Sequence, residues 1–168
     1  VVPARLLNDA AGTESVLTVG GTNASSSFAG VIADNSGVGG TVRLRKVGSG
    51  TLTLSGANTY TGTTLVEAGT LALSGTGSLS SAVLDVRQGA VLDVAASGSM
   101  FTLGSGQTLR IAGTVTGAMD VGSGSSLEVA RPSLGVVNSG DLTVGGTVSV
   151  RLGSPGTVAA PGVSDRVA

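Results

Sequence analysis

Three carboxylates have the spacing that could serve hydrolytic chemistry. Asp85 and Asp93 are eight residues apart and could both face outward from strands, and Asp120 could stack near the column of Asp85. A glycosidase needs two carboxylates about 5–10 Å apart, with sugar-binding side chains beside them. A polysaccharide lyase would need clustered acids for Ca²⁺ and a base such as Arg87. No aromatic residue and no long loop lies near these acids, so we expect solvated acids and no catalytic residue.

Two further groups could contact a glycan. Asn58 and Tyr60 lie in a long link and could contact a sugar. We expect instead that Asn58 adopts a tight-turn conformation and that Tyr60 packs across a corner of the coil. The basic run Arg43-Leu44-Arg45-Lys46 could meet lipopolysaccharide or an acidic glycan, although a solvated strand face is expected there. We therefore assign no binding residue in either group.

Composition excludes much other chemistry. The chain has 168 residues, no His and no Cys, which removes Ser-His-Asp and Cys-His nucleophiles and the usual zinc and iron ligands. Its net charge of −1 offers no basic face for nucleic acid. No apolar run is long enough for a membrane-spanning helix. The glycine-rich Ca²⁺ nonapeptide of other solenoids is missing, so we expect no metal and no cofactor.

The positions of the aliphatic residues repeat along the chain. One track has its first aliphatic residue at 52, 71, 92, 109, 127 and 148, in steps of 17 to 21 residues. A second track lies just upstream at 47, 66, 86, 103, 121 and 144, and a glycine-bearing corner separates the two tracks in each unit. Within each unit, apolar residues alternate with a period of two, which predicts strands and no significant helix.

A unit of about 19 residues cannot bury its own apolar face, so the units must stack. Equivalent strands are one whole coil apart, which is long enough for a parallel connection. The sequence therefore predicts an all-β parallel β-helix of about seven coils, with residues 1–168 forming one domain. A β-sandwich is the alternative, but it favours Asn-Gly or Asp-Gly hairpin turns, and neither dipeptide occurs.

This register makes two side-chain predictions. Asp93, Arg110 and Glu128 should form an outward ladder, because stacked neighbours of alternating charge stabilise a sheet. The core should be filled by the aliphatic columns and by four larger side chains, namely Phe28, Met100, Phe101 and Met119.

Residues 48–62 (Gly-Ser-Gly-Thr-Leu-Thr-Leu-Ser-Gly-Ala-Asn-Thr-Tyr-Thr-Gly), followed by 66–71 (Val-Glu-Ala-Gly-Thr-Leu), closely resemble the passenger-associated repeat of bacterial autotransporters. These are type V secreted surface proteins of Gram-negative bacteria. Upstream, residues 27–32 (Ser-Phe-Ala-Gly-Val-Ile) look like the segment that commonly precedes this repeat. Thr63 and Glu67 depart from the family, in which Gly and Asn are common at these positions.

The close resemblance covers roughly residues 16–75, and residues 76–168 agree in texture and period. Within the second part, residues 141–144 and 164–167 are similar to the looser ends of passenger units. The resemblance implies a right-handed β-helical passenger, carried to the cell surface by a C-terminal outer-membrane barrel of the same precursor. That barrel is a partner outside this chain.

These observations lead to expectations about function. The chain begins at Val1 without a Met or a signal peptide, so we expect a piece of a passenger, extracellular or at the cell surface. A non-enzymatic structural stalk that supports export and display is expected. The alternatives are an adhesive module that binds a glycan or host surface, a filament subunit that self-associates through its end coils, and a polysaccharide-active enzyme.

Overall fold

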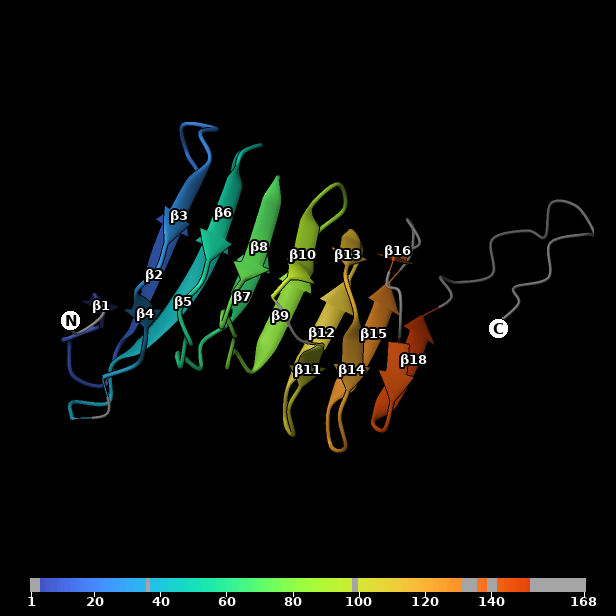
Figure 1. Cartoon of the computed structure of the whole chain (residues 1–168). Helices are drawn as coiled ribbons and strands as arrows, with labels where there is room; N and C mark the ends of the chain where they lie inside the picture. Colours follow the sequence, from blue (N-terminus) through green and yellow to red (C-terminus); the bar gives the residue numbers. More distant parts are fainter. Residues whose placement is uncertain (1–3, 36, 98–99, 131–135, 139–141, 152–168) are drawn as a thin grey trace, which may run out of the picture.

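The computed structural model describes residues 4–35, 37–97, 100–130, 136–138 and 142–151 of the chain. Every regular element in these ranges is a β-strand, and the labels run from β1 to β18 in sequence order. Figure 1 shows the strands side by side, with early strands at one end and late strands at the other. The chain therefore builds an elongated stack rather than two layers assembled from distant segments.

The strands form four sheets. The largest has seven strands and contains β2 (Glu14–Val19), β5 (Thr41–Lys46), β7 (Thr64–Val66), β9 (Val83–Val86), β12 (Thr108–Ile111), β15 (Ser126–Ala130) and β18 (Thr147–Arg151). The second has six strands and contains β3 (Ser26–Phe28), β6 (Thr51–Leu54), β8 (Thr70–Ser74), β10 (Val91–Ala96), β13 (Thr114–Thr116) and β16 (Val136–Asn138). The two small sheets contain β11 (Phe101–Leu103), β14 (Met119–Val121) and β17 (Leu142–Val144) in one, and β1 (Arg5–Leu6) and β4 (Val31–Ile32) in the other.

All pairings between these strands are parallel. Along the chain a strand of the seven-stranded sheet is followed by a strand of the six-stranded sheet, and the next strand of the first sheet comes one turn later. This order is that of a parallel β-helix, which confirms the predicted fold class. A β-sandwich would require antiparallel neighbouring strands. The antiparallel bridge that the structure shows, between Asn35 and Gly40, lies outside the named strands and therefore does not support a sandwich.

The prediction of about seven coils is wrong, because about four turns are complete within the residues that the structure describes. Four turns carry a strand on all three sides: β2–β3–β4, β9–β10–β11, β12–β13–β14 and β15–β16–β17. The turns β5–β6 and β7–β8 carry two named strands each. Their third sides are joined by the bridge between Ala57 and Ser78 and by the backbone hydrogen bond from Ala82 to the Thr61 carbonyl. The strand β18 begins a further turn within the described residues.

The turns also differ in length. Glu14 pairs with Thr41, 27 residues later, whereas Thr108 pairs with Ser126, only 18 residues later. Extra residues lie in the links, where they do not disturb the strand ladders. A single period of about 19 residues therefore describes the average turn but does not locate each corner.

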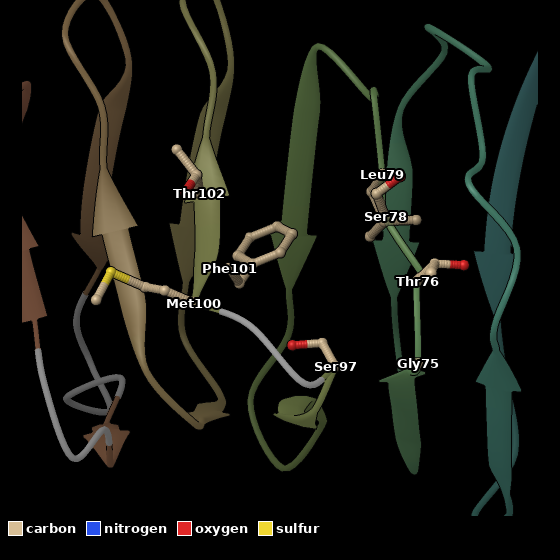
Figure 2. Close-up of a pocket in the computed structure, with 9 residues that line it drawn as sticks. Gly75, Thr76, Ser78, Leu79, Ser97, Met100, Phe101 and Thr102 are labelled. Carbon is tan, nitrogen blue, oxygen red and sulfur yellow. The ribbon is translucent and has the colours of Figure 1, made fainter.

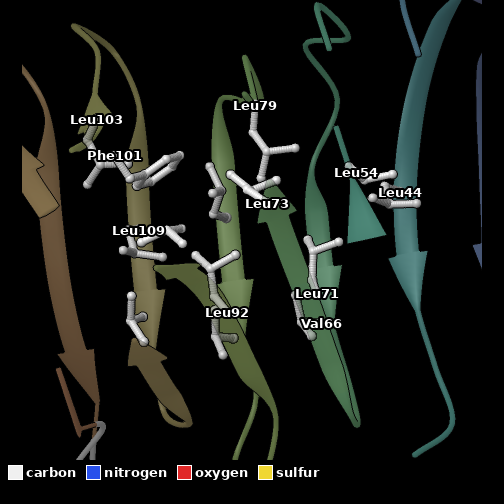
Figure 3. Packing of buried hydrophobic residues seen from close by; sticks show 14 of the residues in the cluster. Leu44, Leu54, Val66, Leu71, Leu73, Leu79, Leu92, Phe101, Leu103 and Leu109 are labelled. Carbon is white, nitrogen blue, oxygen red and sulfur yellow. The ribbon is translucent and has the colours of Figure 1, made fainter. Parts of the chain in front are cut away.

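The interior consists of aliphatic columns that continue from turn to turn. In the seven-stranded sheet, Leu84 stacks on Leu109 and Leu109 on Leu127. In the six-stranded sheet, Leu52 stacks on Leu71 and Leu71 on Leu92. These six leucines are at most 4% exposed, and Figure 3 shows several of them packed between the sheets. Each fully buried leucine stabilises the fold by about 1.5–3 kcal/mol.

Three of the four larger side chains follow the prediction. Met119 and Phe101 are 0% and 6% exposed within the core, and Phe28 packs against it. Met100 is 42% exposed, so its assignment to the core is wrong. It directly precedes Phe101, and neighbouring residues of an extended chain point to opposite faces.

The described residues contain no helix long and apolar enough to cross a membrane.

Candidate functional site

The three acids with catalytic spacing lie on three different sheets. Asp85 belongs to β9 of the seven-stranded sheet, Asp93 to β10 of the six-stranded sheet and Asp120 to β14 of the three-stranded sheet. Asp120 stacks between Thr102 and Thr143, not near Asp85 as predicted. Among the described residues, no group of three or more acidic side chains gathers where a metal ion could bind. The three acids considered for hydrolytic chemistry therefore do not share one sheet.

The predicted charge ladder is half right. The Nε atom of Arg110 donates to Oε2 of Glu128 at 3.0 Å, as the register predicted. Asp93 does not adjoin Arg110, because its neighbours in the sheet are Ala72 and Thr116. Its carboxylate accepts a hydrogen bond from the Thr116 hydroxyl at 2.9 Å.

The residue beside Arg110 on the other side is Asp85, which occupies the place that the prediction gave to Asp93. The cause is a change of sheet between β10 and β11. The prediction stacked Leu109 on Leu92, whereas Leu109 stacks on Leu84, and Leu92 stacks on Val115. The first track stays within one sheet on each side of this point and is shifted by one sheet across it. The second track is also wrong at its start, because Val66 stacks on Lys46 and not on Val47.

The basic run does not form a positive patch. Arg43 and Arg45 face outward and each meets an acid: Arg43 meets Glu14 at 2.8 Å, and Arg45 meets both carboxylate oxygens of Glu67 at 2.9 and 2.8 Å. The hydrogen bond from Arg45 lowers the pKa of Glu67, and the same bond raises the pKa of Arg45. The outer face of the seven-stranded sheet is therefore electrically balanced at this end.

Lys46 is the residue of the run that sequence reasoning placed wrongly. Val42, Leu44 and Lys46 alternate inward along β5, and Lys46 is only 1% exposed. Its Nζ atom donates to three carbonyl oxygens at 2.8, 2.9 and 3.1 Å, those of Val47, Gly48 and Ala68. Burial lowers the pKa of Lys46, while the three acceptors favour its charged form. The ammonium group thus joins two successive glycine corners from inside.

Asn58 is fully buried and links three turns. Its Oδ1 accepts from the backbone N–H of Ile32 at 3.0 Å, and its Nδ2 donates to the carbonyls of Gly56 and Ser78 at 2.9 and 3.1 Å. Asn23, not Asn58, is the described non-glycine residue with a positive φ. The tight-turn reading of Asn58 is therefore wrong, and so is a sugar contact through this amide.

Tyr60 lies beside it and is also inaccessible. Its phenol shares a hydrogen bond of 2.6 Å with the Thr64 hydroxyl, which in turn bonds to the hydroxyl of Ser81. All three side chains are 0% exposed. Burial raises the pKa of Tyr60 to about 12, although both hydroxyls oppose the shift. Tyr60 packs inside a corner, which confirms the expected arrangement, and its side chain cannot contact a glycan.

Tyr60 is the single tyrosine of the chain, so its titration can be followed alone. We expect its absorbance to titrate near 12 in the folded protein and near 10 in urea, the usual value for an exposed phenol. Because the folded pKa is the higher one, this contribution to stability is complete below about pH 10. It should be lost, by about 3 kcal/mol, as the pH rises from about 10 to about 12. A folded-state titration near pH 10 would contradict the burial of Tyr60.

A hollow of about 240 Å³ opens where the third side of the solenoid changes ladder. One wall is formed by residues 75–79 and the other by Ser97, Met100, Phe101 and Thr102. Figure 2 shows Phe101 extending from β11 toward Leu79 and Ser78. No charged side chain lines this hollow. No sequence pattern pointed to this hollow, because the third strand of the turn, β11, was not distinguished from the two-strand repeat.

The fold and these sites define a parallel β-solenoid whose described polar interior groups serve the stacking of turns. A family model described as the passenger-associated transport repeat matches residues 44–73, inside the range that resembles it most closely. Over 144 residues the chain is 37% identical to a Brucella suis biovar 1 (strain 1330) protein named adhesin BmaC autotransporter. The match covers 79% of this chain and 4% of that relative. Both matches support an autotransporter passenger domain. No solved structure matches it.

Proposed function

We propose that this segment is a structural stalk in a passenger displayed on the surface of a Gram-negative bacterium, and that it is not an enzyme. The observation that carries the proposal is the continuity of the ladders, with seven parallel strands in one sheet and six in the next over one aliphatic interior. Each turn contacts only its neighbours, so turns can be added in series without any of them being specialised. Such a structure extends a chain and holds other segments at a distance.

The outer surface supports the same proposal. Arg43, Arg45 and Arg110 are each paired with an acid on the outer face of the seven-stranded sheet. Exposed ion pairs contribute little to stability, but they keep a long sheet face soluble and poorly attractive to charged polymers. Asn58 and Tyr60, which could have contacted a glycan, are buried inside the fold.

The relative supplies the context for display. It is named an adhesin and an autotransporter, and this chain spans about 4% of its length. By analogy, a C-terminal outer-membrane barrel of the same precursor would anchor the passenger outside the cell. In that arrangement the stalk carries adhesive segments away from the membrane, and the stalk itself needs no ligand.

Deleting one whole turn from the full-length precursor tests the proposal. Removal of residues 108–125 excises β12, β13 and β14 and joins the chain where Leu127 can replace Leu109 beside Leu84. Because a stalk depends on stacking and not on particular residues, surface display should stay within about twofold of the unaltered protein. Antibody labelling of a passenger tag on intact cells measures it.

A matched deletion of residues 108–116 removes β12 and β13 but leaves β14, so the following strands meet the wrong sheets. This variant should lose most of its surface signal and become sensitive to protease. The stalk proposal fails if the whole-turn deletion folds normally but abolishes display or adhesion, because a residue-specific role would then lie in residues 108–125.

A further inference from the structure

The third side of the solenoid is interrupted between the turns β7–β8 and β9–β11. On the N-terminal part of this side, Thr59 donates to the Ile32 carbonyl and Asn58 to the Ser78 carbonyl, at 2.9 and 3.2 Å. On the C-terminal part, β11, β14 and β17 form a separate sheet in which β11 is an end strand. The hollow lined by residues 75–79 and by β11 lies at this interruption.

A glutamine side chain closes one end of the interruption. The Nε2 atom of Gln107 donates to the carbonyls of Leu79 and Ser81 at 3.1 and 2.9 Å. A regular ladder would satisfy such carbonyls with the backbone N–H groups of the next strand. Gln107 is held in place because its Oε1 accepts from the N–H of Gly104 at 2.7 Å. The other end of the interruption, beside Met100 and Phe101, is the part that remains hollow.

The backbone N–H and C=O groups of Thr102 point away from β14, its neighbour in the sheet. The N–H of Phe101 donates to the carbonyl of Ala118, and the carbonyl of Leu103 accepts from the N–H of Gly122, so the residues on both sides of Thr102 form their hydrogen bonds with β14. In a parallel strand the groups of successive residues point to alternate sides. The N–H and C=O of Thr102 therefore form the outer edge of β11, where the residue is exposed and borders the hollow.

We propose that this edge of β11 binds a short, uncharged, extended peptide segment of a partner protein by strand addition. A peptide in the extended conformation offers hydrogen-bond partners for the N–H and C=O groups of Thr102, and side-chain pockets then provide selectivity. The exposed Met100 side chain supplies an adaptable apolar contact. The hydroxyl and glycine lining of residues 75–78 contains no charge and would leave a charged side chain of the peptide unpaired.

Peptide recognition agrees better with this hollow than sugar recognition does. Carbohydrate sites usually present an aromatic face, and the one aromatic residue in the lining, Phe101, is only 6% exposed. The proposal is independent of the stalk function, because it concerns one side of one turn, whereas the stalk rests on the two long sheets.

The probe is the capped peptide acetyl-Thr-Leu-Thr-Val-Thr-amide, whose alternation copies β17, a strand of the sheet that β11 begins. In the isolated protein, the amide of Thr102 should exchange rapidly with solvent. At a peptide concentration ten times the Kd, exchange should slow by about tenfold, because only the free fraction exchanges. Amide-resolved hydrogen exchange by NMR measures both states, with Thr102 as the reporter.

Two protein variants separate backbone pairing from side-chain contact. Thr102→Pro removes the edge N–H and is compatible with an end strand, so it should weaken peptide binding by at least about tenfold. Thr102→Val keeps the N–H and should bind like the unaltered protein. If Thr102→Pro fails to fold, a probe N-methylated on alternate residues serves the same purpose, because it cannot complete the ladder and should not bind.

Three results would overturn the proposal. One is slow exchange of the Thr102 amide in the protein alone, which would mean that another part of the chain already occupies the edge. Another is the lack of any change at millimolar peptide. The third is equal binding of the N-methylated probe, which would assign the hollow to side-chain contacts only.

Discussion

Replacing Gly48 with alanine is expected to destabilise the solenoid by about 3–5 kcal/mol, at the upper end of single substitutions. Gly48 turns the corner between β5 and β6 with a φ of 68°, a conformation that L-residues rarely adopt. A Cβ atom there would also overlap the carbonyl oxygen of Gly20 in the preceding turn and would lie 2.8 Å from Oδ1 of Asn23. Both neighbours are fixed by the stack, so relaxation must move a whole corner.

Gly89 provides a matched control for this substitution. It turns the corner between β9 and β10 with a φ of 78°, but a Cβ atom there would meet nothing within 4 Å. Gly89→Ala should therefore lower the free energy of unfolding by only about 1–2 kcal/mol, the cost of holding an L-residue in the left-handed conformation. Urea unfolding of both variants measures the difference. Equal losses would mean that the close approach of successive corners contributes nothing, and that positive φ alone explains the glycines.

The sequence was sufficient to predict the stacking but not the sheet to which each strand belongs. Alternation with a period of two reports which side chains face inward, and glycine reports where the chain turns. Neither signal distinguishes the three sides of a turn. The clearest case is the tetrapeptide Val-Leu-Asp-Val, which occurs at 83–86 and again at 91–94. The first copy is β9 of the seven-stranded sheet, and the second begins β10 of the six-stranded sheet.

Identical local sequences therefore place Asp85 and Asp93 on different faces. What separates them is the partner strand: Asp85 lies beside Arg110, and Asp93 lies beside Thr116. Those pairings depend on the lengths of the intervening links, which vary from turn to turn. The predicted ladder thus failed at Asp93 and succeeded at Glu128, because residues 108–129 contain no change in turn architecture.

Polar residues inside the solenoid were predictable only in part. The packing of Tyr60 inside a corner was predicted, whereas Asn58 was expected in a tight turn and is instead a buried amide that links three turns. Gln107 and Lys46 carried no such signal, since a long polar side chain is usually exposed. The alternation of Val42, Leu44 and Lys46 along the strand places Lys46 on the inward face, but its charge predicts an exposed side chain. Its burial depends on the three carbonyl acceptors in neighbouring corners, which cannot be recognised from the sequence.

Lys46 is the residue for which the second large effect is expected. Lys46→Met keeps the length of the side chain and its aliphatic stem but removes the donor to Val47, Gly48 and Ala68. A methionine would suit the column, in which its neighbours are Val19 and Val66. The loss of the donor acts in the opposite direction, because a buried carbonyl left without a hydrogen bond costs about 1–3 kcal/mol.

We expect the unpaired carbonyls to outweigh the gain in apolar contact, with a net loss of about 3 kcal/mol in the free energy of unfolding. Arg45→Met on the same strand is the control, since Arg45 is exposed and its removal breaks only a solvent-screened pair with Glu67. Urea unfolding of the two variants should separate them clearly. If Lys46→Met is as stable as the unaltered protein, the ammonium group does not join the two corners, and the column would accept an aliphatic residue at this position as it does in neighbouring turns.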